Sequence, residues 1–107
     1  MITINIRYTG KNGSARQFAE EMEASGTADA IRAEKGNIRY EYFIPMSDPE
    51  TVLLIDSWES QEAIDIHHAS TMMKTIADLR ERFDLHMTVE RYESAEAADG
   101  DDKFIRK

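Results

Sequence analysis

The 107-residue sequence predicts an α+β domain of the ferredoxin-like type, with the element order β-α-β-β-α-β and an antiparallel sheet. Two observations predict this class. Several stretches alternate between apolar and polar residues or are rich in β-forming residues, as strands are. Between them lie stretches with apolar residues at helical spacing, and glycine or proline marks several of the boundaries. This element order places both helical regions on one face of the sheet.

The first strand and the helices that follow it come from the first third of the chain. Residues 1–8 alternate, with three isoleucines on one side, and predict a strand. Ser14 and Gln17 have the spacing of a capping box, which predicts a helix that ends near Gly26. A shorter helix is expected over residues 27–35, because a glycine follows it.

Two strands follow in the middle of the chain. Residues 37–44 alternate in a second strand, which predicts Ile38 on the same face as Tyr40 and Tyr42. Residues 51–58 form a third strand that is apolar on both faces. A domain of this size has helices for only one face of a sheet. We therefore expect a second copy of the chain to cover the other face, as in a homodimer.

The second helical region and the last strand complete the domain, which we expect to span residues 1–93. Ser60 is expected to cap a helix that begins at residue 61, and Ser70 a further helix. Residues 85–92 predict the last strand. Residues 94–107 form an acidic tail with an apolar end, Phe104-Ile105, that is expected to dock on the body of the domain or on a partner subunit.

Composition excludes several classes of function. The net charge of −8 disfavours binding to nucleic acids and to anionic membranes. The chain has no cysteine, which excludes disulfides, thiolate nucleophiles and iron–sulfur clusters. No apolar stretch is long enough for a signal peptide or a membrane span, so a cytoplasmic location is expected. His67 and His68 point about 100° apart on a helix, and no metal site is expected.

The chemistry of the chain is expected to concentrate where the third strand meets the next helix. Trp58 ends that strand, and His67 lies about two turns into the helix. A helix that folds back over its own sheet brings His67 toward Trp58, so that an aromatic surface and a titratable ring face one small ligand. Each residue also has a structural interpretation: Trp58 as a core anchor, and His67 as a buried helix residue bonded to a backbone carbonyl.

Four further residues are candidates for binding a substrate. Asn5 could position a substrate oxygen, and Arg7 could stabilise an oxyanion, although a solvent-exposed or dimer-facing role is the default for both. Tyr40 could add a hydroxyl hydrogen bond to its packing role. Met72 could line the core or the pocket, where a flexible thioether adapts to irregular shape.

The sequence resembles the antibiotic biosynthesis monooxygenase family, including its quinol monooxygenase-like members, over roughly residues 1–93. The similar segments are Gly36-Asn-Ile-Arg-Tyr-Glu-Tyr42 and Trp58-Glu-Ser-Gln-Glu-Ala63, followed by His67. The resemblance implies a dimeric α+β barrel in which two sheets pack face to face. It also implies oxygenation of phenols or quinols without flavin, haem or metal.

This resemblance makes His67 the candidate base in a cofactor-free oxidation of a small aromatic molecule. Two other hypotheses stay open. The chain could be a non-catalytic dimer that binds a small molecule on the same scaffold, because a fold alone does not establish an activity. It could also be a dimeric α+β barrel enzyme of another type, such as a sugar mutarotase or a lactone isomerase.

Overall fold

The computed structural model describes residues 1–107 and confirms the predicted α+β fold. Each predicted helical connection consists of two helices. The elements are β1 (Ile2–Thr9), α1 (Ser14–Ala24), α2 (Thr27–Arg32), β2 (Asn37–Phe43), β3 (Thr51–Trp58), α3 (Gln61–His68), α4 (Met72–Arg82), β4 (His86–Glu93) and the short 3₁₀ helix η1 (Asp101–Phe104).

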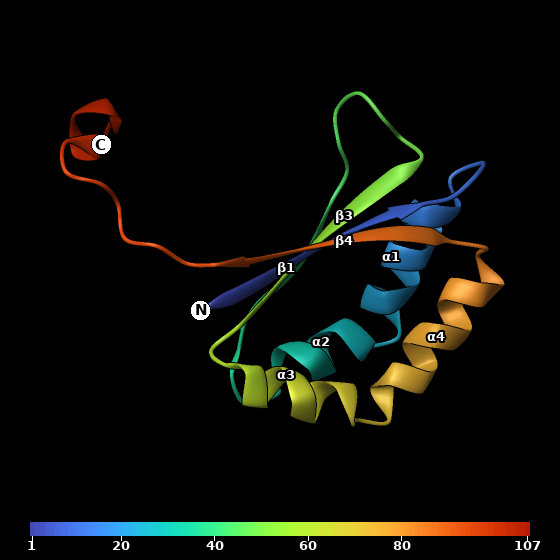
Figure 1. Ribbon diagram of the computed structural model, residues 1–107. Coiled ribbons are helices and arrows are strands. Elements are labelled where there is room, and N and C mark those ends of the chain that lie inside the picture. The colour runs from blue at the N-terminus through green and yellow to red at the C-terminus, as the bar shows by residue number, and fades with distance from the viewer.

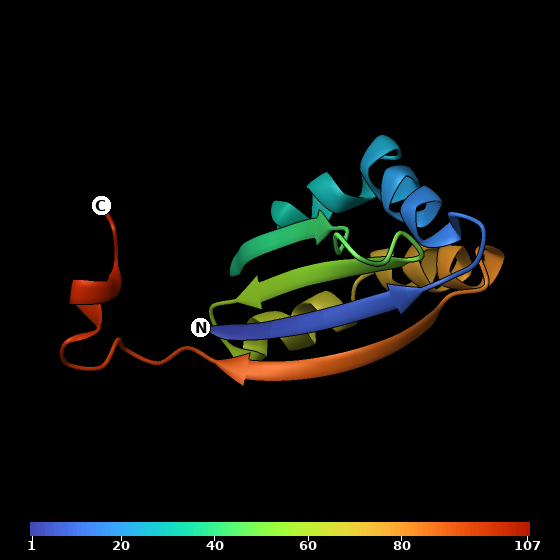
Figure 2. The same cartoon turned by 90° about the horizontal axis from the view of Figure 1, so that it is seen from above.

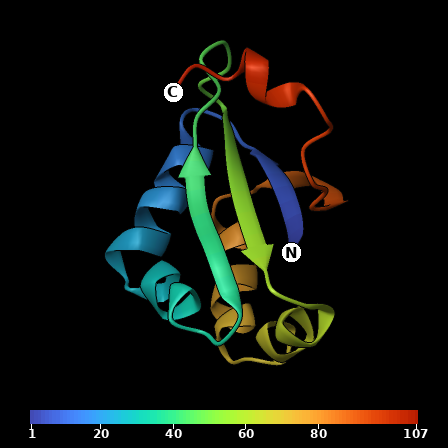
Figure 3. The same cartoon turned by 90° about the vertical axis from the view of Figure 1, so that its left-hand side faces the viewer.

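The four strands form one antiparallel sheet in the order β2-β3-β1-β4. Figure 1 shows that the helices α1 to α4 all lie on one face of this sheet, and Figure 2 shows the strand order from above. In the end view of Figure 3, α1 and α2 flank the edge formed by β2. The other face of the sheet has no covering element and is called here the helix-free face.

The core lies between the sheet and the helices. Trp58, Tyr8 and Phe18 are completely buried there. On the helix-free face of β3, Leu53 and Ile55 are only half-buried. The prediction that β3 is apolar on both faces is therefore confirmed, and one of those faces is uncovered within the monomer.

Several local predictions differ from the structure. Gly13, in a left-handed conformation, occupies the N-cap of α1, and the Ser14 hydroxyl instead accepts a hydrogen bond from the N–H of Lys11 at 3.0 Å. Thr71 occupies the N-cap of α4, and the Ser70 hydroxyl is buried without a partner. The predicted caps at Ser14 and Ser70 are thus wrong.

A register shift between Asn37 and Arg39 interrupts the alternation of β2. Ile38 lies within this irregularity and is 51% exposed. It lines a hollow on the helix-free face together with Asn5 and Ile55. The prediction that Ile38 shares a face with the two tyrosines is therefore wrong, because an extra residue in one strand turns its neighbours to the other face.

The C-terminal tail leaves the end of β4 and stands apart from the body, as Figures 1 and 2 show. Phe104 is 81% exposed and Ile105 is 55% exposed, so this apolar end does not dock on the body of its own chain. No helix of the structure has both the length and the apolar composition that crossing a membrane requires.

Candidate functional site

Trp58 and His67 are brought together by the tight connection between β3 and α3. The Ser60 hydroxyl caps α3 by accepting a hydrogen bond from the N–H of Ala63 at 3.2 Å, as predicted. Gly36 lets α3 approach closely, since a Cβ at this position would lie 2.6 Å from the Cβ of Ala63. The chain direction is fixed further by the N–H of Glu59, which donates to the carbonyl of Gly36 at 2.8 Å.

The imidazole of His67 stacks on the indole of Trp58. The ring centroids are 4.7 Å apart, and the two planes are inclined by 29°. Nδ1 of His67 lies 3.1 Å and 3.2 Å from the two carboxylate oxygens of Glu34, which follows α2. The bonding of Nδ1 to Glu34 leaves Nε2 as the nitrogen that can exchange a proton with another group. His67 is only 4% exposed, so contact with solvent is limited.

Asp56 adds a second carboxylate, which binds the indole nitrogen of Trp58. The indole Nε1–H donates to Oδ1 of Asp56 at 2.6 Å, and Asp56 is 7% exposed. Burial raises the pKa of Asp56 to about 6, because the charged form loses hydration, while the nearby His67 and the hydrogen bond from Trp58 act in the opposite direction. We call Glu34, His67, Trp58 and Asp56 the buried polar cluster.

A pair of tyrosines on β2 adjoins this cluster. The hydroxyl oxygens of Tyr40 and Tyr42 are 3.1 Å apart, and their rings meet edge to face. Tyr40 lies directly opposite Asp56 across the β2–β3 ladder, on the helix-covered face. Burial raises the pKa of both tyrosines, so each hydroxyl keeps its proton near neutral pH and acts as a hydrogen-bonding group.

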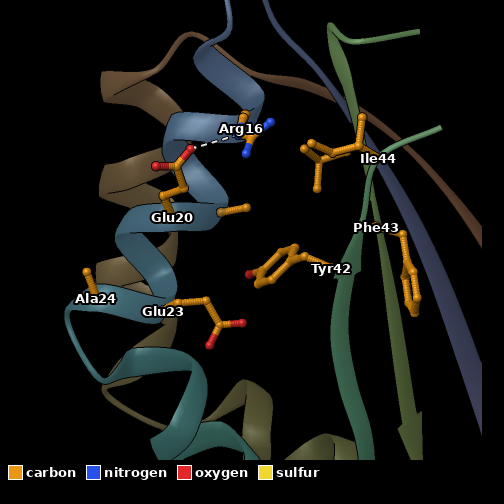
Figure 4. Close-up of a pocket in the computed structure, with 9 residues that line it drawn as sticks. Arg16, Glu20, Glu23, Ala24, Tyr42, Phe43 and Ile44 are labelled. Carbon is orange, nitrogen blue, oxygen red and sulfur yellow. Dashed lines mark hydrogen bonds and ion pairs between the residues drawn. The ribbon is translucent and has the colours of Figure 1, made fainter. Parts of the chain in front are cut away.

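A mainly apolar hollow lies between α1 and the end of β2. It has a volume of about 660 Å³, and we call it the α1–β2 hollow. In Figure 4, Tyr42 extends from β2 across this space, and its hydroxyl points toward α1. The residues that line the hollow are Arg16, Ala19, Glu20, Glu23, Ala24, Tyr42, Phe43, Ile44 and Val52. Neither Trp58 nor His67 lines it.

The predicted site residues fall on two sides of the sheet. Trp58, His67 and Tyr40 share the helix-covered side, where Met72 packs against the same core from the start of α4. Asn5 and Arg7 lie on the helix-free face, since their neighbours in β1 point toward the helices. The Oδ1 atom of Asn5 is buried and has no hydrogen-bond partner. The sheet therefore separates Asn5 and Arg7 from the buried polar cluster of the same chain.

Glu34 and Asp56 are the two site residues that the sequence analysis missed. Glu34 is 33 residues from His67, and no local spacing connects them. Asp56 carried a usable signal, because it is a carboxylate within a mainly apolar strand. No three His, Asp or Glu side chains of the structure come together in an arrangement that could hold a metal ion.

Comparison with known proteins identifies relatives by sequence pattern and by fold. The pattern of the antibiotic biosynthesis monooxygenase family matches residues 1–79. No curated protein matches the sequence at a significant level. Many solved structures share the fold. The three described below are between 14% and 20% identical to this chain, and an identity this low is informative about the fold alone.

Three of these structures illustrate the similarity. One is a protein from Deinococcus radiodurans whose description assigns it to the antibiotic biosynthesis monooxygenases. It has a TM-score of 0.79 and 20% identity to this chain, and the alignment covers 92% of this chain and 97% of that one. PA3566 from Pseudomonas aeruginosa has a TM-score of 0.75 and 19% identity, with 89% and 94% covered. SnoaB, a cofactor-independent oxygenase from Streptomyces nogalater, has a TM-score of 0.75 and 14% identity, with 92% and 96% covered.

Proposed function

Because the chain belongs to the antibiotic biosynthesis monooxygenase family, we propose that it oxidises a small aromatic quinol or phenol with dioxygen and uses no flavin, haem or metal. The observation that carries this proposal is the His67 ring held between Glu34 and Trp58 inside the family's fold. A base that is oriented by a carboxylate, next to an aromatic surface, is what such a reaction requires from the protein. SnoaB, which shares the fold, is described as a cofactor-independent oxygenase.

The reaction needs the protein mainly for proton transfer and for holding the ring. Loss of a proton turns a quinol into an electron-rich anion, which can pass an electron to dioxygen. Combination of the two radicals gives a peroxide on the ring. Loss of water then leaves one oxygen atom on the substrate, so a quinol becomes a hydroxyquinone and dioxygen takes up all four electrons.

We assign the base to His67. Glu34 holds Nδ1 through both carboxylate oxygens, which fixes the orientation of the ring and stabilises the imidazolium that forms when Nε2 takes a proton. Trp58 supports the ring from one side, and Asp56 fixes the indole through its hydrogen bond. His67 thus has an orienting partner on two sides, as a general base does.

We further propose that the working unit is a homodimer joined through the helix-free face. Apolar side chains on this face, such as those of Leu53, Ile55 and Phe43, are only half-buried in the monomer. Burying them against a second sheet would stabilise the assembly by the hydrophobic effect. In that arrangement, Asn5 and Arg7 would lie between the two sheets rather than next to the substrate of their own chain.

Oxygen uptake by the purified protein, with hydroquinones and anthrone-like phenols as substrates, tests the proposal. The variant His67→Ala should lower turnover at least about 100-fold, as loss of a general base does. The matched control is His86→Ala, since His86 is a solvent-exposed histidine on β4. Equal turnover by wild type and His67→Ala would remove His67 from the mechanism.

A second candidate function is binding without turnover. It is favoured by the 4% exposure of His67 and by the position of the α1–β2 hollow, which His67 does not line. Absence of oxygen uptake across the panel, together with ligand-dependent increases in melting temperature, would favour a binding protein over an oxygenase.

A further inference from the structure

We propose that the α1–β2 hollow binds an uncharged, flat phenol and that the hydroxyl of Tyr42, which is itself hydrogen-bonded to that of Tyr40, forms its polar end and hydrogen-bonds the hydroxyl of the ligand. This inference rests on the proposed function, because it names the site and the charge of the substrate. It moves the place of binding away from Trp58, where the sequence alone suggested it, toward β2 and α1.

The size and lining of the hollow fit such a ligand. Its volume of about 660 Å³ is in the range of small-molecule sites. Six of its nine lining residues are hydrophobic, among them the aromatic Tyr42. Figure 4 shows the ring of Tyr42 standing in the space between the strand and the helix, where a flat ligand could lie against it.

The charges at the rim are neutralised within the protein. Glu20 pairs with Arg16 at 3.0 Å. Glu23 pairs with Arg32, with its two carboxylate oxygens 2.7 Å and 2.6 Å from the guanidinium nitrogens. The hollow therefore offers no unpaired charge to a ligand. An anionic ligand would meet two carboxylates without gaining a free cation, so an uncharged ligand is favoured.

The tyrosine pair has hydrogen-bonding capacity left for a ligand. The Tyr40 and Tyr42 hydroxyls bond to each other, and neither makes another hydrogen bond within the protein. Two hydroxyls that share one hydrogen bond keep one O–H donor and further lone pairs unused. Since both hydroxyls remain protonated, they recognise a hydroxyl group rather than act as the base.

The position of the pair also connects the hollow with the proposed base. Tyr40 lies opposite Asp56 in the sheet, and Asp56 is hydrogen-bonded to the indole on which His67 stacks. A ligand hydroxyl held by the pair would thus face the side of the molecule that contains the buried polar cluster.

Binding of 2-naphthol, measured by calorimetry under nitrogen, tests this inference without turnover. Tyr42→Phe should weaken 2-naphthol binding about three- to tenfold, as loss of one hydrogen bond does, and should leave the affinity for 2-methoxynaphthalene within twofold. Ala24→Trp, at an exposed position on the wall of the hollow, should weaken binding of both ligands at least about tenfold. The control Tyr92→Phe changes a half-exposed tyrosine on β4 and should change neither.

A charged analogue completes the experiment. We expect 6-hydroxynaphthalene-2-sulfonate to bind at least about tenfold more weakly than 2-naphthol. Binding of 2-naphthol that neither Tyr42→Phe nor Ala24→Trp affects, or absence of any binding by the folded wild type, would overturn the assignment of the hollow. Binding with the expected variant effects but without oxygen uptake in air would support the hollow and refute the oxygenase proposal.

Discussion

Replacing Asp56 by asparagine should change how the stability of the protein depends on pH. The carboxyl of Asp56 has a pKa of about 6 in the folded protein, against 3.8 for an exposed aspartate. The folded state therefore binds more protons than the unfolded state between these two pH values. By linkage, the free energy of unfolding falls as pH rises through this window, because burying the charged form costs energy.

The magnitude follows from the size of the shift. A rise of the pKa from 3.8 to about 6 means that the charged carboxylate lowers the free energy of unfolding by about 3 kcal/mol at pH values above 6, since each pKa unit is worth about 1.4 kcal/mol. Roughly 2.4 kcal/mol of this appears between pH 4 and pH 7. Asparagine has no charge to bury, and its amide oxygen can still accept the hydrogen bond from Trp58.

Urea unfolding of wild type and Asp56→Asn at pH 4 and pH 7 measures the effect. The difference in free energy of unfolding, variant minus wild type, should increase by about 2 kcal/mol from pH 4 to pH 7. The other carboxylates titrate in both proteins and cancel in this comparison. A difference that stays constant between the two pH values would show that Asp56 titrates normally and would refute the reasoning.

Three further predictions follow from the geometry. Gly36→Ala should lower the free energy of unfolding by at least about 2 kcal/mol, because the left-handed backbone and the 2.6 Å contact with Ala63 both oppose a Cβ. Gly26 has a similar φ but open space around it, so Gly26→Ala should cost less in the same unfolding assay. Glu34→Gln should lower turnover about tenfold, which is less than the effect of His67→Ala. The control Glu96→Gln, in the tail, should leave turnover unchanged. Equal kcat for Glu34→Gln and wild type would contradict an orienting role of Glu34. Light scattering should show a dimer at micromolar concentration, and a folded monomer would contradict pairing through the helix-free face.

The sequence was sufficient to predict the strands and helices because their signals are local. The alternation in residues 1–8 and the apolar run in residues 51–58 correspond to β1 and β3 within one residue at either end. The predicted cap at Ser60 is confirmed for the same reason, since a cap depends on residues three positions apart. The predicted caps at Ser14 and Ser70 are wrong. Gly13, in a left-handed conformation, occupies the N-cap of α1, and Thr71 occupies the N-cap of α4.

The candidate site was only partly predictable because it is assembled from distant segments. The approach of His67 to Trp58 follows from a helix that folds back on its own strand, and the structure shows it. Glu34 reaches His67 only through the packing of α2 and α3 beneath the same sheet, which no local window reveals. The α1–β2 hollow depends on how far α1 stands from β2, and this spacing results from the whole core.

Asp56→Asn also separates two roles for the buried carboxylate. If Asp56 only anchors Trp58, asparagine should serve equally well, because its amide oxygen accepts the same hydrogen bond, and oxygen uptake should not change. If Asp56 exchanges protons with its neighbours in the buried polar cluster, asparagine should reduce kcat at neutral pH. It should do so even though it makes the free energy of unfolding less dependent on pH. We expect the second result, because a buried carboxylate that costs about 3 kcal/mol is a more expensive anchor than a neutral amide. Unchanged oxygen uptake by the variant would assign Asp56 to the support of Trp58 alone.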